Sequence, residues 1–169
     1  IINGEKVKSL SELFKDINWE YLSEGIPVRF HGDFHFENIL WNEASNKFIF
    51  LDWRQDFGGS IEYGDIYYDL AKIYHALIVS GKVIRKNEYE MKGSDIITIN
   101  FFLRENLIRF LKIFENFVNE NNFDLKHIRI LSSLIYLNIA PLHHDPYNKF
   151  VFNFGRYLLN KSLNNLWPY

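Results

Sequence analysis

The chain has no cysteine among its 169 residues, only one methionine and only four prolines. The absence of cysteine excludes disulfide bonds, thiolate catalysis and zinc sites with cysteine ligands. It also gives no support to a small secreted scaffold held together by disulfides. With 47% apolar and 24% charged residues, the chain is long enough and apolar enough to fold around a core of its own.

The sequence also lacks a long apolar run and an excess of positive charge. No run reaches the roughly 18 residues that a membrane-spanning helix needs, and the mixed-charge start does not resemble a signal peptide. The net charge is −2 and the isoelectric point is about 6.3, which does not favour binding to a nucleic-acid backbone. We therefore expect one cytoplasmic domain that binds neither membranes nor nucleic acids.

Hydrophobic patterning predicts an α+β fold, mostly helical, with one small β-hairpin. The apolar runs "NILWN" and "FIFLDW", joined by the turn "EASNK", predict the hairpin. Ser9 and Glu12 form a capping-box pattern at the start of a helix. The segment "KVIRKNEYEMKGSD" is either an irregular connection or a second short hairpin. Helices are expected over about 9–17, 66–80, 107–118, 128–140 and 149–160.

Chemistry-bearing residues gather around the predicted hairpin, in "HGDFHFENILWNEASNKFIFLDW". Asp33 precedes Asn38 by five residues, and Asp52 follows fourteen residues after Asn38. Because antiparallel strands return to their starting point, the hairpin should bring Asn38 and Asp52 to one end. Amide and carboxylate oxygens suit Mg²⁺, which takes one or two protein carboxylates together with phosphate oxygens. The additional carboxylate, Asp33, can accept a proton from an attacking hydroxyl.

This order of residues is that of kinase-type phosphoryl transfer, in which a loop aspartate is followed by an asparagine and a second aspartate. Protein kinases read H-R-D-x-x-x-x-N and then D-F-G, whereas this chain reads "HGDFHFEN" and then "DWR". The glycine in place of arginine, and the later segment "GDIYYDLAK", resemble the aminoglycoside phosphotransferase and choline-kinase-like family. The resemblance covers at least residues 29–77.

The resemblance implies a protein-kinase-like fold, of which this single domain would be the carboxy-terminal, catalytic lobe with the site at its β-hairpin. The implied activity is Mg²⁺-dependent transfer of the γ-phosphoryl group of ATP or GTP to a hydroxyl of a small molecule. Asp33 would be the catalytic base, Asn38 and Asp52 would ligate Mg²⁺, and His35 would contact phosphate or substrate. Local similarity around Arg54 favours a sugar or cell-envelope precursor as the acceptor.

Other polar residues near this segment have both a structural and a functional interpretation. His31 would hold the loop in place, and Asp69 would brace it by accepting hydrogen bonds. Asp65 would act in the same way at the start of the helix. Asp65 and Asp69 would equally suit an ordinary pair of solvated carboxylates, which the helix dipole favours at this position.

The segment "APLHHDP" carries a second group of polar residues after a predicted helix end. His143, His144 and Asp145 would line the acceptor pocket of a kinase-like lobe, or would simply belong to a surface loop. A His-Asp pair is also typical of all-helical metal-dependent phosphohydrolases. That site needs a further upstream histidine and a later aspartate, and no aspartate follows Asp145.

The sequence contains neither G-x-G-x-x-G nor a P-loop, so the usual means of holding a triphosphate is absent. The chain begins at Ile1, and its only methionine is Met91. We therefore expect that an amino-terminal lobe of the same protein is the partner of this segment, and that residues 1–169 alone bind Mg-nucleotide weakly. A non-catalytic kinase-like binding module is the alternative, although such a module has no chemical reason to keep all three site residues.

Overall fold

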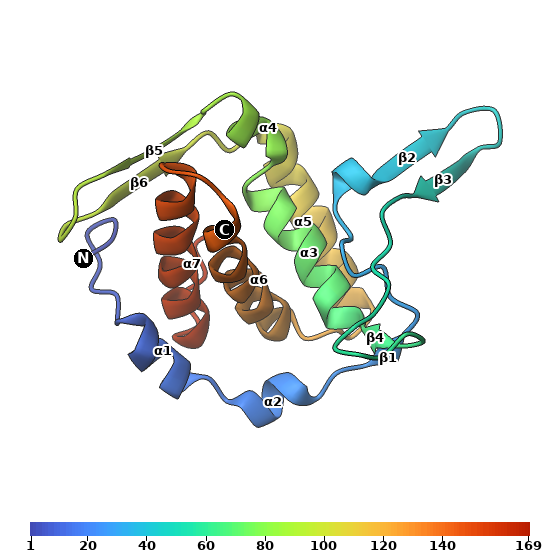
Figure 1. The fold of residues 1–169 in the computed structure, drawn as a ribbon, viewed down its shortest axis with the longest axis horizontal. Helices are drawn as coiled ribbons and strands as arrows, with labels where there is room; N and C mark the ends of the chain where they lie inside the picture. The colour runs from blue at the N-terminus through green and yellow to red at the C-terminus, as the bar shows by residue number, and fades with distance from the viewer.

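The computed structural model describes residues 1–169, and its centre is a group of packed helices (Figure 1). Helix α6 (Leu125–Ile139) packs against both α3 (Ile66–Ile78) and α7 (Tyr147–Leu163). Helix α5 (Glu105–Glu120) packs against α3. The fold is therefore α+β with helices as the larger part, as the sequence predicts. No helix is both long enough and apolar enough to span a membrane.

The apolar faces of these helices form the main core, which is rich in aromatic rings. Tyr74, Tyr136, Phe150 and Phe154 are each at most 1% exposed. Phe150 and Phe154 are one helical turn apart on α7, and their rings stack with centroids 5.7 Å apart. Aromatic pairs of this kind add to the stabilisation from buried apolar area. The high aromatic content of the chain is thus used in part to fill this core.

Side chains at the helix ends explain where the helices begin and end. The capping box predicted at Ser9 and Glu12 is confirmed at the start of α1 (Leu10–Asp16). Pro141 lies in a short 3₁₀ turn, η2 (Ala140–Leu142), that follows α6 directly. Proline lacks the backbone N–H that a continuing helix requires, so the predicted end of α6 at this residue is also confirmed.

Three two-stranded antiparallel sheets accompany the helices: β1 (Pro27–Val28) with β4 (Gly64–Asp65), β2 (Ile39–Asn42) with β3 (Lys47–Phe50), and β5 (Tyr89–Lys92) with β6 (Thr98–Phe101). The predicted hairpin is confirmed as β2–β3, in which Ile39 is paired with Phe50. This hairpin projects away from the helices (Figure 1).

Three short elements lie outside the sequence predictions. Helix α2 (Trp19–Ser23) is a single turn capped by Asn18, whose side chain accepts a hydrogen bond from the Tyr21 backbone N–H. In the segment 82–95, the short hairpin predicted as one alternative is confirmed in part. The segment begins in helix α4 (Gly81–Arg85), and its strand β5 then forms a hairpin with β6, which lies beyond the segment. Strand β6, the partner of β5, lies in a segment that alternates apolar and polar residues from Ile97 to Phe101, and the sequence prediction missed this pattern.

Candidate active site

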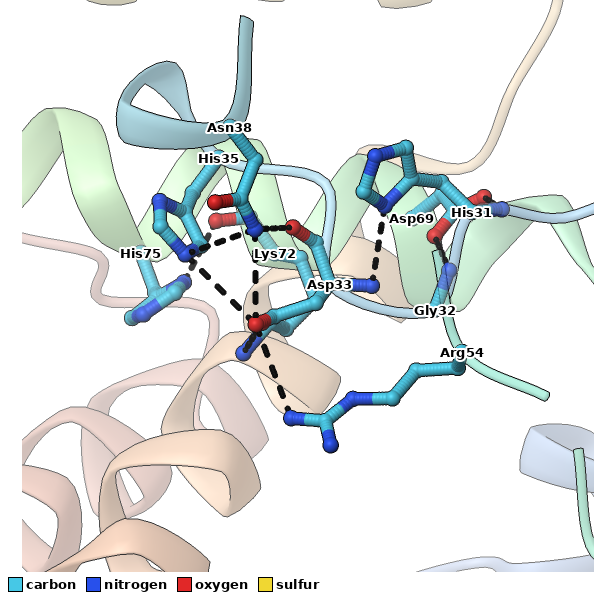
Figure 2. A network of polar contacts seen from close by, with 9 residues as sticks. All are labelled: His31, Gly32, Asp33, His35, Asn38, Arg54, Asp69, Lys72 and His75. Carbon is cyan, nitrogen blue, oxygen red and sulfur yellow. Dashed lines mark hydrogen bonds and ion pairs between the residues drawn. The ribbon is translucent and has the colours of Figure 1, made fainter. Parts of the chain in front are cut away.

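The loop between β1 and β2 is anchored to helix α3 through one carboxylate. Asp69 accepts hydrogen bonds from the backbone N–H groups of His31 (2.7 Å) and Gly32 (2.8 Å), as Figure 2 shows. Burial raises the pKa of Asp69, and the two backbone donors oppose that rise because they favour the charged form. Asp69 therefore lies where the resemblance places it, against the H-G-D backbone.

His31 fills the space behind this loop. It is 4% exposed, and its ring stacks on Trp53 with centroids 4.8 Å apart. The Nδ1 atom accepts the backbone N–H of Asp33 at 3.3 Å, so the ring proton is assigned to Nε2. Gly32 has φ +79°, and a Cβ atom there would lie 2.5 Å from Cγ of Arg54. Only glycine suits both the backbone and the space, which explains the glycine of the H-G-D motif.

Asp33 is surrounded by three basic side chains (Figure 2). Its carboxylate lies 2.7 Å from Nζ of Lys72, 3.5 Å from a guanidinium nitrogen of Arg54 and 3.6 Å from Nε2 of His35. Burial alone would raise the pKa of Asp33, but the hydrogen bond and charge of Lys72, together with the charges of His35 and Arg54, outweigh burial. The pKa therefore lies below its ordinary value, and the carboxylate is ionised at neutral pH.

Asn38 ends the 3₁₀ turn η1 (Phe36–Asn38) and connects the loop to the hairpin. Its Nδ2 atom donates to the backbone carbonyl of Asp33 at 3.0 Å and lies 3.3 Å from Nε2 of His35. With the amide nitrogen committed in this way, Oδ1 has no hydrogen-bond partner in the protein. The backbone N–H of Leu51 donates to the Asn38 carbonyl at 2.8 Å, so Asp52 follows directly after the residue that pairs with Asn38.

Asp52 is exposed and forms no hydrogen bond or ion pair through its carboxylate. Its backbone is in the left-handed region, with φ 57°, and every other non-glycine residue with positive φ in the chain is an asparagine. No group of three or more His, Asp or Glu residues lies close enough together to hold a metal. Oδ1 of Asn38 and the Asp52 carboxylate are nevertheless suitable donors for Mg²⁺, which obtains its remaining ligands from phosphate and water.

A cavity of about 550 Å³ opens beside Asp33 and Lys72. It extends along α3 past His75 to α4, and its lining includes side chains of α5, α6 and α7. Nδ1 of His75 lies 2.5 Å from the Lys72 carbonyl, which can only accept, so Nδ1 carries the proton. Burial, followed by the charge of Lys72, lowers the pKa of His75 to about 3. His75 is therefore neutral at the cavity wall, and Nε2 is a hydrogen-bond acceptor.

Of the other residues proposed from the sequence, some lie at the cavity and some do not. His143 lines the cavity, whereas His144 and Asp145 do not, and Asp145 instead pairs with Lys149 at 2.9 Å. The expected role of Asp65 needs correction, because its side chain does not contact the H-G-D loop. It accepts from the backbone N–H groups of Ile26 and Tyr67, each at 3.1 Å, and so caps α3 and holds the chain entering β1.

Lys72 and His75 were missed by the sequence reasoning. Both follow Asp69 on α3 at helical spacings, on a helix whose other inward-facing residues are apolar or aromatic. The signal that could have found Lys72 is a lysine within the buried stripe of the "DLAK" segment, where a charge needs a partner. Its partner, Asp33, could not be identified without knowing which face of α3 meets the loop.

Comparison with known proteins gives one match. Residues 7–88 match the model of a family described as "Phosphotransferase enzyme family" (APH). No curated protein and no solved structure matches the chain. The matched segment contains the H-G-D loop, the β2–β3 hairpin and the residues of α3 that hold the loop. The match of residues 7–88 to this phosphotransferase family agrees with the resemblance carried by the H-G-D and D-W motifs of the chain.

Proposed function

We propose that the protein is a Mg²⁺-dependent small-molecule kinase, which transfers the γ-phosphoryl group of ATP or GTP to a hydroxyl of its acceptor. The observation that carries this proposal is the position of Asp33. Its ionised carboxylate lies at the wall of a cavity of about 550 Å³, within 3.5 Å of the Asn38 amide and 2.7 Å of the Lys72 ammonium. A cavity of this size suits a small molecule.

In this proposal, Asp33 orients the acceptor hydroxyl and takes up its proton. The hydroxyl oxygen forms a bond to the γ-phosphorus while the bond from that phosphorus to the β,γ-bridging oxygen breaks, and the nucleoside diphosphate leaves. Because neighbouring cations hold the pKa of Asp33 below its ordinary value, the carboxylate is a weak base. Its main contribution would then be to position the hydroxyl, and proton transfer would follow as the new bond forms.

Asn38 and Asp52 would hold Mg²⁺, which when bound neutralises charge on the phosphate oxygens. Support for Asp52 comes from its exposed carboxylate, which forms no hydrogen bond or ion pair within the protein and follows directly after the residue paired with Asn38. Lys72 would place a positive charge beside the transferring group, where negative charge accumulates in the transition state.

The proposal is tested by following nucleotide consumption with Mg²⁺, ATP or GTP and a panel of small hydroxyl compounds. Asp52→Asn should weaken Mg²⁺ binding in the presence of nucleotide by at least about tenfold, because even indirect partners of metal ligands have effects of that size. Asp56→Asn is the matched control, since Asp56 is also exposed and lies four residues further along the same loop. Nucleotide binding without any transfer, unchanged by Asp52→Asn, would instead identify a non-catalytic binding module.

A further inference from the structure

The cavity beside Asp33 differs in charge from the chain as a whole. The complete chain has a formal net charge of −2 with histidine counted as neutral. On the same basis, the cavity lining has four positive side chains and two negative ones, an excess of two positive charges. These six side chains are Arg54, Lys72, Lys82, Arg85, Asp33 and Glu37. A concave site with charge of one sign concentrates ligands of the opposite sign.

The positive charges lie at two ends of the cavity. Arg54 and Lys72 share the Asp33 carboxylate at one end. Lys82 and Arg85 lie on α4 at the other end, and between the two ends the wall is lined by α3 residues from Lys72 to Ala76 and by Val79, which caps α3. A ligand that contacts both groups of charges would therefore lie along the α3 side of the cavity.

The charges at the α4 end are available to a ligand. Lys82 is exposed and has no ion pair or side-chain hydrogen bond within the protein. Arg85 pairs with Glu37, but both side chains of this pair are more than half exposed, at 65% and 51%. Exposed pairs of this kind contribute only about 0–1 kcal/mol, so an incoming anion can displace Glu37 from Arg85 at little cost.

The wall between the two ends suits a carbon skeleton with few polar groups. Leu107, Phe110 and Ile139 contribute apolar surface, and Nε2 of His75 is an acceptor facing no protein donor. A single fixed acceptor can hold one additional hydroxyl of a ligand and thereby fix its orientation. The cavity therefore offers an ionised base at one end, an apolar wall with one acceptor, and uncompensated positive charge at the other end.

We infer that the acceptor is an anionic hydroxyl compound, which presents a hydroxyl to Asp33 and places a phosphate or carboxylate against Lys82 and Arg85 in the same cavity. This inference rests on the proposed function, because it treats the cavity as the acceptor site. A cationic acceptor would face an excess of like charge at both ends. A neutral acceptor would leave the charge of Lys82 without a partner.

The inference is tested by calorimetric titration of the protein with four related compounds and with inorganic phosphate. The compounds are a hexose, its 6-phosphate, the corresponding hexuronate and the corresponding cationic amino sugar. The 6-phosphate or the hexuronate should bind at least about tenfold more tightly than the hexose, because a hydrogen bond to a charged group is worth about that factor. A preference for one of these two anions identifies whether the acceptor carries phosphate or carboxylate.

Lys82→Ala should weaken binding of the preferred anion and of inorganic phosphate by about tenfold and leave hexose binding unchanged. Lys86→Ala is the matched control, since Lys86 ends the same short helix, is exposed and does not line the cavity. Equal binding of the hexose and both anions, tightest binding of the amino sugar, or no binding of inorganic phosphate would overturn the inference. An equal loss in Lys86→Ala would also overturn it.

A separate titration distinguishes the acceptor from the nucleotide. Anion binding should persist when a non-hydrolysable ATP analogue and Mg²⁺ are present, because nucleotide and acceptor must bind together. Competition between them would assign the positive charges to the triphosphate and overturn the inference. Since these titrations need no turnover, anion binding without any phosphoryl transfer would count against the proposed function alone. Transfer to neutral hydroxyl compounds with no preference for anions would count against the charge inference alone.

Discussion

The helical body and the β2–β3 hairpin are both rich in aromatic residues, but their environments are opposite. In the helical body, Tyr74 and Phe150 are fully buried. In the hairpin, Trp41 is 49% exposed and Phe48 is 61% exposed, and they pack mainly against each other with ring centroids 4.9 Å apart. The hairpin strands pair only with one another. The helices therefore supply most of the stability, whereas the hairpin contributes chiefly by holding Asn38 and Asp52 at its base.

The largest effect that would sharpen this comparison is on activity, at the loop that enters the hairpin. Asp33→Asn should reduce the phosphoryl-transfer rate by about 10²- to 10⁴-fold, the range for loss of a general base. The amide oxygen of asparagine can still accept from Lys72, so the protein should retain a cooperative thermal transition. The transfer rate is measured by nucleotide consumption, and the thermal transition of the same preparation is measured by circular dichroism. Activity that survives this substitution would remove Asp33 from the reaction.

The next effect is on stability and contrasts the two regions directly. Phe154→Ala should lower the free energy of unfolding by about 3–5 kcal/mol. Phe154 is only 1% exposed, so removing its ring leaves a cavity in the aromatic core. Phe48→Ala in the hairpin is the matched control and should cost less than about 1 kcal/mol, mostly through its contact with Trp41. Denaturant unfolding followed by fluorescence measures both. Similar losses in the two variants would contradict the division between body and hairpin.

A smaller effect is expected where the two regions meet, at Lys72. Lys72→Met keeps the side-chain length but removes the ammonium 2.7 Å from Asp33. The rate should fall about ten- to a hundredfold, the value of one hydrogen bond between charged groups. Lys72 lowers the pKa of Asp33, so its removal should shift the acidic limb of the kcat/KM profile to higher pH. An unchanged profile would mean that Lys72 does not act through Asp33.

The smallest expected effect is on the pH dependence of stability, through the neutral His75 on α3. The pKa of His75 is about 3 in the folded protein, through burial and then the charge of Lys72, and about 6.5 when unfolded. Between these values the unfolded state binds more protons, so this part of the stability is complete above about pH 6.5 and declines as the pH falls, by at most about 1.4 kcal/mol per pH unit.

His75→Asn removes this titration and can keep a donor to the Lys72 carbonyl. Compared between pH 7 and pH 5 by urea unfolding, the variant should lose less stability than the unsubstituted protein. His127 and His143 also have pKa values lowered by burial, and both remain in the variant, so the difference between the two proteins isolates His75. Equal losses in the two proteins would show that His75 does not couple folding to pH.

Much of this organisation could be predicted from the sequence, because local signals dominate it. The β2–β3 hairpin follows from two apolar runs and a turn, and the start of α1 follows from its capping box. The order of Asp33, Asn38 and Asp52 points to the loop that we propose to be the reacting one, because their spacing in the chain carries chemical information. The backbone contact between Asn38 and Leu51 agrees with the prediction that the hairpin ends meet.

The rest depended on contacts between segments distant in sequence, which periodicity does not encode. The approach of Lys72 to Asp33 requires the particular face of α3 that Asp69 fixes against the loop. The role of Asp65 was assigned to the wrong partner because a helix-cap aspartate and a loop-bracing aspartate have the same local sequence. The cavity charge arises only when α4 is folded over the end of α3, and neither element alone indicates it.

Two side chains on one turn of α3 contact the loop between β1 and β2. Asp69 holds the loop backbone, and Lys72, three residues later, holds the Asp33 side chain. Because of these contacts, the loop backbone and the Asp33 side chain would move together with α3. Asp52 has no such attachment and lies at the base of the projecting hairpin, next to the Asn38–Leu51 contact. The two carboxylates are therefore held differently, because contacts with α3 fix the side chain of Asp33, whereas only the local backbone places Asp52.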